Sequence, residues 1–161
     1  MRVIKRETER FQDYKVPSMY IGCIQCSGKC CIEAGIPIEV CINNDWRKSK
    51  IVEVSDDDII KKYLSNPITE AIIFAGLEPF EQFDEIISFI EKLRKEYNCL
   101  DDIVIYTGYT DEESIEYIDK FKQFKNIIVK FGRYIPNQEK HYDEILCADL
   151  ASDNQYAKKI S

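Results

Sequence analysis

The sequence predicts an α/β fold, a partial barrel of mainly parallel strands in one domain that spans residues 1–161. Short apolar runs alternate with amphipathic helical segments, which is typical of strand–helix–strand units and a parallel sheet. Several of these apolar runs end at glycine or cysteine, and 161 residues suffice for one sizeable core. In such folds the functional groups gather at the carboxyl ends of the strands.

The amino-terminal third predicts one strand, a long loop and one helix. Residues 16–21 are a short apolar run that predicts a first buried strand, and residues 22–50 follow without a clear period. Loops of that length in compact domains usually carry function. Ser55 precedes three aspartates and two isoleucines, which predicts a helix with Ser55 as its N-cap, and Asn66-Pro67 ends that helix.

Two strand–helix units follow. Residues 71–75 are continuously apolar, the pattern of a strand buried on both faces, and residues 83–93 place apolar side chains at helical spacing. Residues 103–107 predict the next buried strand. The sequence Thr110-Asp-Glu-Glu113 is a capping-box pattern that opens another amphipathic helix.

The carboxyl-terminal third predicts two further strands. Residues 126–131 form another buried apolar run that ends at Gly132, and residues 145–150 form a weaker one. Four segments thus fall at the carboxyl ends of predicted strands: the cysteine-rich loop and residues 76–79, 108–110 and 132–133. We expect them to meet at one edge of the sheet.

The charged residues restrict what the protein binds. The formal net charge of -7 and the pI near 4.9 argue against a nucleic-acid-binding surface. Residues 2–10 are charged and lack the apolar core of a secretory signal, and no apolar run reaches the length of a membrane span. We therefore expect a cytoplasmic protein that binds neither nucleic acid nor a membrane.

Five of the seven cysteines lie close together, at positions Cys23, Cys26, Cys30, Cys31 and Cys41. Thiols stay reduced in the cytoplasm and the total is odd, so structural disulfides are the least favoured interpretation. Adjacent thiols cannot easily bind one metal ion. The separated set Cys26, Cys30 and Cys41 could hold three irons of a cubane cluster and leave the fourth iron open.

A closed zinc site is the alternative that the cysteine spacing leaves open. It would use Cys23, Cys26, Cys41 and one of the adjacent pair Cys30 and Cys31. The spacing alone does not separate this interpretation from the cluster.

Motifs beyond the cysteines add a family resemblance. In chain order they are Cys26-x3-Cys30 with Cys41-Ile-Asn, Gly76-Leu-Glu78-Pro79, Ile-Tyr-Thr-Gly108-Tyr109 and Ser152-Asp-Asn154-Gln155. The series resembles the radical S-adenosylmethionine superfamily, and within it the short activating enzymes of anaerobic ribonucleotide reductase. The resemblance runs from about residue 18 to the end of the chain.

The resemblance implies an oxidoreductase with a radical-SAM-like partial barrel, a 4Fe-4S cluster and S-adenosyl-L-methionine. One-electron reduction would cleave the cofactor to a 5′-deoxyadenosyl radical, which abstracts hydrogen from a glycine of a partner enzyme. The implied partner is a glycyl-radical enzyme, the large subunit of anaerobic ribonucleotide reductase. The implied electron donor is flavodoxin or ferredoxin. The protein positions the cofactor and excludes water, while the cofactor carries the chemistry.

The resemblance also implies roles for individual residues. The cluster ligands are Cys26, Cys30 and Cys41, with Cys23 and Cys31 in reserve. The proposed contacts with S-adenosylmethionine are Val40, Gly76, Leu77, Glu78, Pro79, Gly108 and Tyr109. Among these, Gly76 to Pro79 take the place of a Gly-Gly-Glu-Pro turn, and Val40 takes the position near adenine. No catalytic residue is implied beyond the cluster.

Two departures from the family pattern stand out. Ten residues, 31–40, separate Cys30 from Cys41, where the family has two; long loops are tolerated because closure cost grows slowly with length. Leu77 replaces the second glycine of the turn, and a leucine there would be strained if φ were positive. These departures leave room for a divergent enzyme with another substrate, or for a non-catalytic zinc- or cluster-stabilised binding module.

Overall fold

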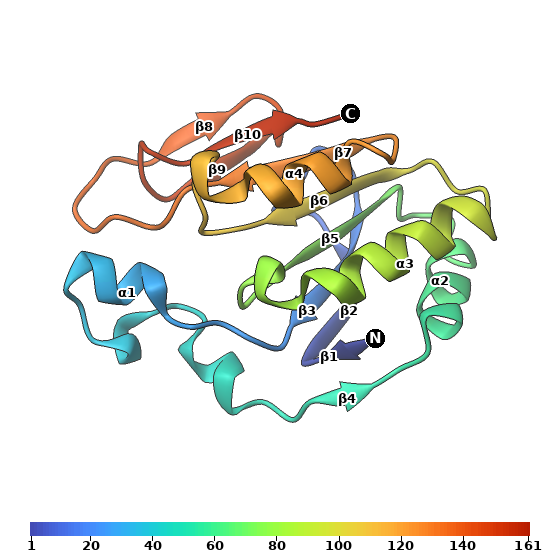
Figure 1. Ribbon diagram of the computed structural model, residues 1–161, viewed down its shortest axis with the longest axis horizontal. Helices are drawn as coiled ribbons and strands as arrows, with labels where there is room; N and C mark the ends of the chain where they lie inside the picture. Colours follow the sequence, from blue (N-terminus) through green and yellow to red (C-terminus); the bar gives the residue numbers. More distant parts are fainter.

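The computed structural model describes the backbone of residues 1–161 and the side chains of all residues except 5–8. A six-stranded sheet with the order β10-β7-β6-β5-β3-β2 forms its centre (Figure 1). Its strands are β2 (Lys5–Arg10), β3 (Ser18–Cys23), β5 (Ala71–Gly76), β6 (Asp102–Tyr106), β7 (Ile127–Phe131) and β10 (Tyr156–Lys159). The four inner strands are mutually parallel, and β2 and β10 pair antiparallel to them at the two edges. The predicted α/β fold with a mainly parallel sheet is confirmed, and the sheet is open.

Three helices cover one face of the sheet: α2 (Asp56–Leu64), α3 (Phe83–Lys95) and α4 (Ile115–Phe121) (Figure 1). Helix α3 buries five apolar residues at helical spacing, Phe83, Ile86, Phe89, Ile90 and Leu93. They pack with the strand residues that point to this face and form the larger core of the protein. The helical period read from residues 83–93 is therefore confirmed.

Both predicted capping patterns are confirmed by hydrogen bonds, although the second opens a short 3-10 helix, Glu112–Ser114, that leads into α4. The Asp58 N–H donates to Ser55 Oγ at 3.1 Å at the start of α2. The Thr110 N–H donates to Glu113 Oε2 at 3.0 Å, and the Glu113 N–H donates to Thr110 Oγ1 at 3.4 Å. These reciprocal bonds satisfy backbone donors that a helix start leaves unpaired.

The opposite face of the sheet carries a smaller core, partly covered by a hairpin of β8 (His141–Asp143) and β9 (Ala148–Leu150). The strand predicted at residues 145–150 is only half formed and pairs with β8 instead of the main sheet. The Asp143 carboxylate accepts hydrogen bonds from the Ile145 and Leu146 N–H groups, and Cys147 has a φ of 55°. These features make residues 144–147 a turn.

The segment predicted as one long loop contains short helices. It holds α1 (Lys29–Ala34) and two 3-10 helices, Ile38–Val40 and Asn44–Lys48, before β4 (Val52–Glu53) pairs with β1 (Arg2–Val3). In Figure 1 this segment lies beyond the ends of the inner strands, on the side where α3 and α4 begin. No helix among the described residues has the length and apolar character needed to cross a membrane.

Candidate functional site

The candidate site lies where the parallel strands end. The turn after β5 is tied to the cysteine-rich segment by two hydrogen bonds: the Glu78 N–H donates to the Gln25 carbonyl at 2.7 Å, and the Ser27 N–H donates to Glu81 Oε1 at 2.7 Å. The turn after β6 lies next to both, because Gly108 contacts Cys30 and Glu78. The structure thus brings together segments that the sequence places at separate strand ends.

Glu78 is the polar centre of this edge. It is only 7% exposed, yet both carboxylate oxygens accept hydrogen bonds. Oε1 accepts from the Thr107 hydroxyl at 2.6 Å and the Phe80 N–H at 3.1 Å, and Oε2 accepts from the Gly108 N–H at 2.9 Å. Burial raises the pKa of Glu78, although these hydrogen bonds oppose the shift. Glu78 therefore joins the ends of β5 and β6.

Four thiols occupy this edge of the sheet. Cys26 Sγ accepts a hydrogen bond from the Gly28 N–H at 3.3 Å, and its charge acts on both Cys30 and Cys31. Burial, together with the Glu78 charge, raises the pKa of Cys30 to about 11. Burial also raises the pKa of Cys31, which is within hydrogen-bonding reach of Cys41. Cys31 and Cys41 are therefore neighbours, and Cys26 and Cys30 lie at the same edge.

The fifth clustered cysteine has a different position. Cys23 ends β3, is 1% exposed and belongs to the larger core beneath the helices. Burial raises its pKa well above the usual value, with further contributions from Glu78 and Glu85. Its environment is that of a buried thiol that packs as a small apolar residue.

The arrangement of the thiols bears on which metal group they fit. Among the side chains that the structure describes, no three or more His, Cys, Asp or Glu residues converge as ligands of one metal ion. A structural zinc site needs four ligands around a single point, whereas an iron–sulfur cluster accepts thiolates at separate irons. Thiol donors without a histidine suit both zinc and iron–sulfur clusters, but thiols that do not converge on a single point fit the cluster better.

Gly108 leaves the space that Cys30 fills. A Cβ added to Gly108 would lie 2.8 Å from Cys30 Sγ and 3.4 Å from Glu78 Oε2. Because real Cβ contacts are rarely this short, a larger residue would displace the thiol. The predicted contact residue Gly108 is thus required, in this structure, by a close approach to a proposed ligand.

The Gly108→Ala protein should fold but bind metal poorly. We expect the added methyl group to move Cys30 and lower the bound iron several-fold, with a stability loss of about 1 kcal/mol from overpacking. Iron and sulfide analysis after anaerobic reconstitution, beside urea unfolding, would measure both effects. A wild-type iron content in this variant would show that Cys30 does not need its present position.

The turn at residues 76–79 does not carry the backbone strain that a positive φ at Leu77 would cause. The positive φ of 91° falls on Gly76, whereas Leu77 is absent from the residues with positive φ and is 6% exposed in the core. Leu77 is therefore not strained. The Asn43 side-chain amide donates to the Gly76 carbonyl at 2.6 Å, and the Trp46 ring packs on the Gly76 backbone. Pro79 follows as the first residue of a 3-10 helix, Pro79–Gln82.

The other predicted cofactor contacts have contrasting environments. Val40 is 62% exposed on the cysteine-rich segment, so the structure places it at the surface. Tyr109 is half-buried, with its ring centroid 5.7 Å from that of Phe80 and 6.1 Å from that of Tyr117. Tyr109 therefore lies between the strand end and α4, beside the thiol-bearing segment.

The Ser-Asp-Asn-Gln element supports the end of β7. The Asn154 side-chain amide donates to the Arg133 carbonyl at 2.8 Å, and the Gln155 amide donates to the Gly132 carbonyl at 3.2 Å. Gly132 has a φ of 93°, and a Cβ there would lie 2.7 Å from the Asn154 carbonyl oxygen. This element fixes the turn from which Arg133 projects.

A charged network that the sequence did not reveal attaches α1 to this turn. Arg133 binds Glu113 through two hydrogen bonds of 2.7 Å and forms a 2.9 Å ion pair with Glu33, while Lys29 also binds Glu113. Arg133 is only 8% exposed. A bidentate arginine–carboxylate pair of this kind is stronger than an ordinary surface ion pair. The network fixes Cys30 and Cys31 through the helix that carries them.

Glu113→Gln should lower stability by about 1–2 kcal/mol at pH 7. Arg133 is the main cause that holds the pKa of Glu113 well below its usual range, with help from Lys29 and the Thr110 N–H. A depressed pKa means that the contribution is present above the unfolded-state pKa, about 4.3, and is lost as the pH falls. Because the folded-state pKa lies far below that value, urea unfolding from pH 7 to pH 3 should show the difference between the two proteins begin to narrow below about pH 4.3 without vanishing; a constant difference would contradict the assignment.

A buried lysine at the same edge was also missed. Lys130 on β7 is 6% exposed, and its ammonium group donates to the Gly132 carbonyl at 2.8 Å. Burial lowers the pKa of Lys130 to about 8, while the charges of Cys30 and Glu78 oppose the shift. The sequence shows a single lysine within an apolar strand, and nothing in that pattern indicates that its ammonium group is buried at the candidate site.

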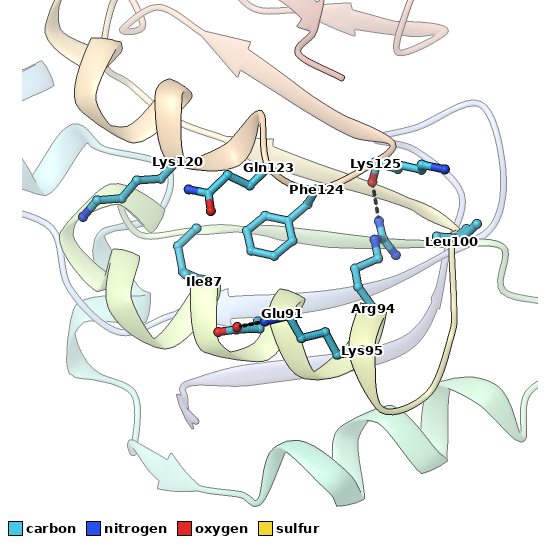
Figure 2. Close-up of a pocket in the computed structure, with 9 residues that line it drawn as sticks. All are labelled: Ile87, Glu91, Arg94, Lys95, Leu100, Lys120, Gln123, Phe124 and Lys125. Atoms are coloured by element: carbon cyan, nitrogen blue, oxygen red, sulfur yellow. Dashed lines mark hydrogen bonds and ion pairs between the residues drawn. The ribbon is translucent and has the colours of Figure 1, made fainter.

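A separate groove of about 380 Å³ lies between α3 and the end of α4 (Figure 2). Its lining residues are Ile87, Glu91, Arg94, Lys95, Leu100, Lys120, Gln123, Phe124 and Lys125. Arg94 donates to the Cys99, Asp101 and Lys125 carbonyls, which lie just before β6 and β7. The groove is therefore at the amino ends of the strands, opposite the thiols.

Comparison with known proteins agrees with the chemistry of the thiols. A family model described as a 4Fe-4S single cluster domain matches residues 22–155. The matched range contains all four thiols of the site and omits the outer strands β2 and β10. No curated protein and no solved structure gave a significant match.

Proposed function

Because this chain belongs to the 4Fe-4S single cluster domain family, we propose that it is a radical S-adenosylmethionine oxidoreductase. Membership of this family supports the presence of an iron–sulfur cluster but does not specify a reaction. The proposed reaction generates a 5′-deoxyadenosyl radical and installs a glycyl radical on an anaerobic ribonucleotide reductase.

The observation that carries the proposal is the position of the thiols at the carboxyl ends of the parallel strands. We assign Cys26, Cys30 and Cys41 as the ligands that would hold the cluster. Cys31 lies within hydrogen-bonding reach of Cys41, too close for both thiols to serve well-separated irons without rearrangement. Three ligands leave one iron open, and when bound the cluster would supply the electron that cleaves S-adenosylmethionine.

The chain's own residues would orient the substrate and exclude water. Residues 76–79 form a turn directly against the thiol-bearing segment, and Glu78 fixes it to the end of β6. The polar backbone of this turn is the proposed binding surface for the methionine group. Trp46 covers Gly76 and would limit the access of water to the same place.

The decisive experiment is anaerobic reconstitution with iron and sulfide, followed by reduction with dithionite in the presence of S-adenosylmethionine. The proposal predicts a brown protein that releases 5′-deoxyadenosine and methionine. A colourless protein that binds zinc and releases neither product would refute it. A brown protein that releases neither would support the family assignment and reject the reaction.

The partner requires its own test. We propose that the acceptor is a glycyl-radical enzyme and that flavodoxin or ferredoxin supplies the electron. Incubation with an anaerobic ribonucleotide reductase large subunit should produce a glycyl-radical signal in electron paramagnetic resonance. Cleavage of S-adenosylmethionine without this signal would point to another substrate.

A further inference from the structure

Lys130 is a buried charge for which the protein supplies little compensation. Lysine is almost never fully buried unless it is paired, and its ammonium group carries three N–H donors. Lys130 is 6% exposed and donates to one backbone carbonyl, that of Gly132. Among the ion pairs of the described side chains none involves Lys130. This environment favours a nearby anion.

The strand pattern explains why the side chain is enclosed. Ile127, Val129 and Phe131 point to the helix-covered core, so Lys130 projects from the opposite face together with Ile128. Its neighbours across the sheet are Tyr106 on β6 and Ala157 on β10. An apolar side chain of similar length would suit this face, so the sheet itself does not require a charge here.

The nearest acidic groups belong to the candidate site. The Lys130 ammonium group donates to the Gly132 carbonyl, and the Gly132 N–H in turn donates to the Tyr109 carbonyl at 2.9 Å. The residue before Tyr109, Gly108, lies against Cys30 Sγ and donates to Glu78. Lys130 is therefore at the same strand ends as Cys30 and Glu78, whose charges oppose the lowering of its pKa by burial. Glu78 is already satisfied by Thr107, Phe80 and Gly108. Among the described side chains no comparable set of donors surrounds Cys30. Of the two cations that lower its pKa, Arg133 is already paired with Glu113 and Glu33, so the Lys130 charge is the one left to stabilise the Cys30 thiolate.

We propose that Lys130 is the countercharge of the cysteine-bound cluster and raises its reduction potential. The inference rests on the proposed cluster at Cys26, Cys30 and Cys41. Thiolate ligands make the cluster anionic, and one-electron reduction adds a further negative charge. A fixed ammonium group inside the protein stabilises the reduced state more than the oxidised one, because net charge and burial set cluster potentials. Lys130 is in this sense a positioning and tuning residue, without a direct step in the reaction.

The test compares reconstituted wild-type protein with Lys130→Met, Lys130→Gln, Lys130→Arg and a control, Lys125→Met. Lys125 is exposed and lines the groove just before β7 begins, at the amino ends of the strands and away from the thiols. Far-UV circular dichroism and iron content establish folding and cluster assembly. Midpoint potentials come from reductive titration with dithionite, read by electron paramagnetic resonance.

We expect Lys130→Met and Lys130→Gln to shift the midpoint to more negative values, so that the reduced fraction at a fixed potential falls about tenfold. Lys130→Arg and Lys125→Met should stay near the wild type. An unchanged midpoint in both neutral variants would overturn the proposal. Loss of the cluster from the neutral variants but not from Lys130→Arg would support a countercharge, whereas loss from all three would indicate a purely steric role and overturn it.

These results separate the two proposals. A wild-type protein that assembles no cluster would refute the proposed function and, with it, the basis of this inference. A wild-type protein with a cluster whose potential ignores Lys130 would refute the countercharge alone.

Discussion

The Cys41→Ala protein is expected to lose essentially all of its reconstituted iron and sulfide, whereas Cys31→Ala is expected to keep its cluster. The physical reason is the direction in which the thiols leave the backbone. Cys30 and Cys31 are adjacent on α1, so their side chains point apart, and only one of them can face the position shared with Cys26. Cys41 directly follows the separate 3-10 helix Ile38–Val40 and can supply the third direction.

The contact between Cys31 and Cys41 makes this a demanding test. Since the two thiols are neighbours, Cys31 is the group most able to replace Cys41. The double variant Cys31→Ala/Cys41→Ala gives the baseline without either thiol, and Cys147→Ala, an exposed cysteine outside the site, controls for the loss of any thiol. Retained cluster in Cys41→Ala together with loss in Cys31→Ala would move the third ligand to Cys31.

The Gly76→Ala protein should be destabilised by about 2–4 kcal/mol, and its Trp46 fluorescence should shift towards that of a solvent-exposed indole. Two effects combine. The positive φ of Gly76 strains any L-residue, and the new Cβ would lie 2.2 and 2.4 Å from Trp46 ring atoms. Because Trp46 is the single tryptophan of the chain, the emission reports the environment of this one ring.

Gly35→Ala is the matched control for Gly76→Ala. Gly35 ends α1 with a φ of 62°, and a Cβ there meets nothing within 4 Å. Its replacement should therefore cost only the backbone term, about 1 kcal/mol, without a change in emission. Urea unfolding followed by both fluorescence and circular dichroism would measure the difference. Equal losses in the two variants would show that Trp46 does not press on the strand end.

The elements that the sequence predicts well are those whose signal is local. The strands near residues 71–75, 103–107 and 126–131 are continuous apolar runs, and the helix starts at Ser55 and Thr110 carry capping residues. The outer strands gave no such signal. Residues 5–10 are almost entirely charged and residues 156–159 end in two lysines, because edge strands need backbone pairing more than apolar side chains.

The residues of the candidate site also differ in how far the sequence alone reveals them. The crowding of thiols and the strand-end turns are visible in the sequence, and so is Glu78 within its motif. The partners that hold them are not, since Lys29 and Glu113 are 84 positions apart and Arg133 and Glu113 are 20 apart. Only the fold brings such residues together. Leu77 shows a limit of the motif comparison. The sequence suggested backbone strain at Leu77, but the positive φ belongs to Gly76.

The placement of the two antiparallel edge strands has a consequence for biosynthesis. β2 precedes the thiol-bearing segment and β10 follows every other strand of the main sheet, so β10 is the last strand to be added to it. Chains are made from the amino terminus, and an unpaired edge such as that of β7 can pair with another chain. The thiols are thus synthesised well before the strand that protects β7, so a nascent chain already carries every thiol of the site while the β7 edge is still unpaired.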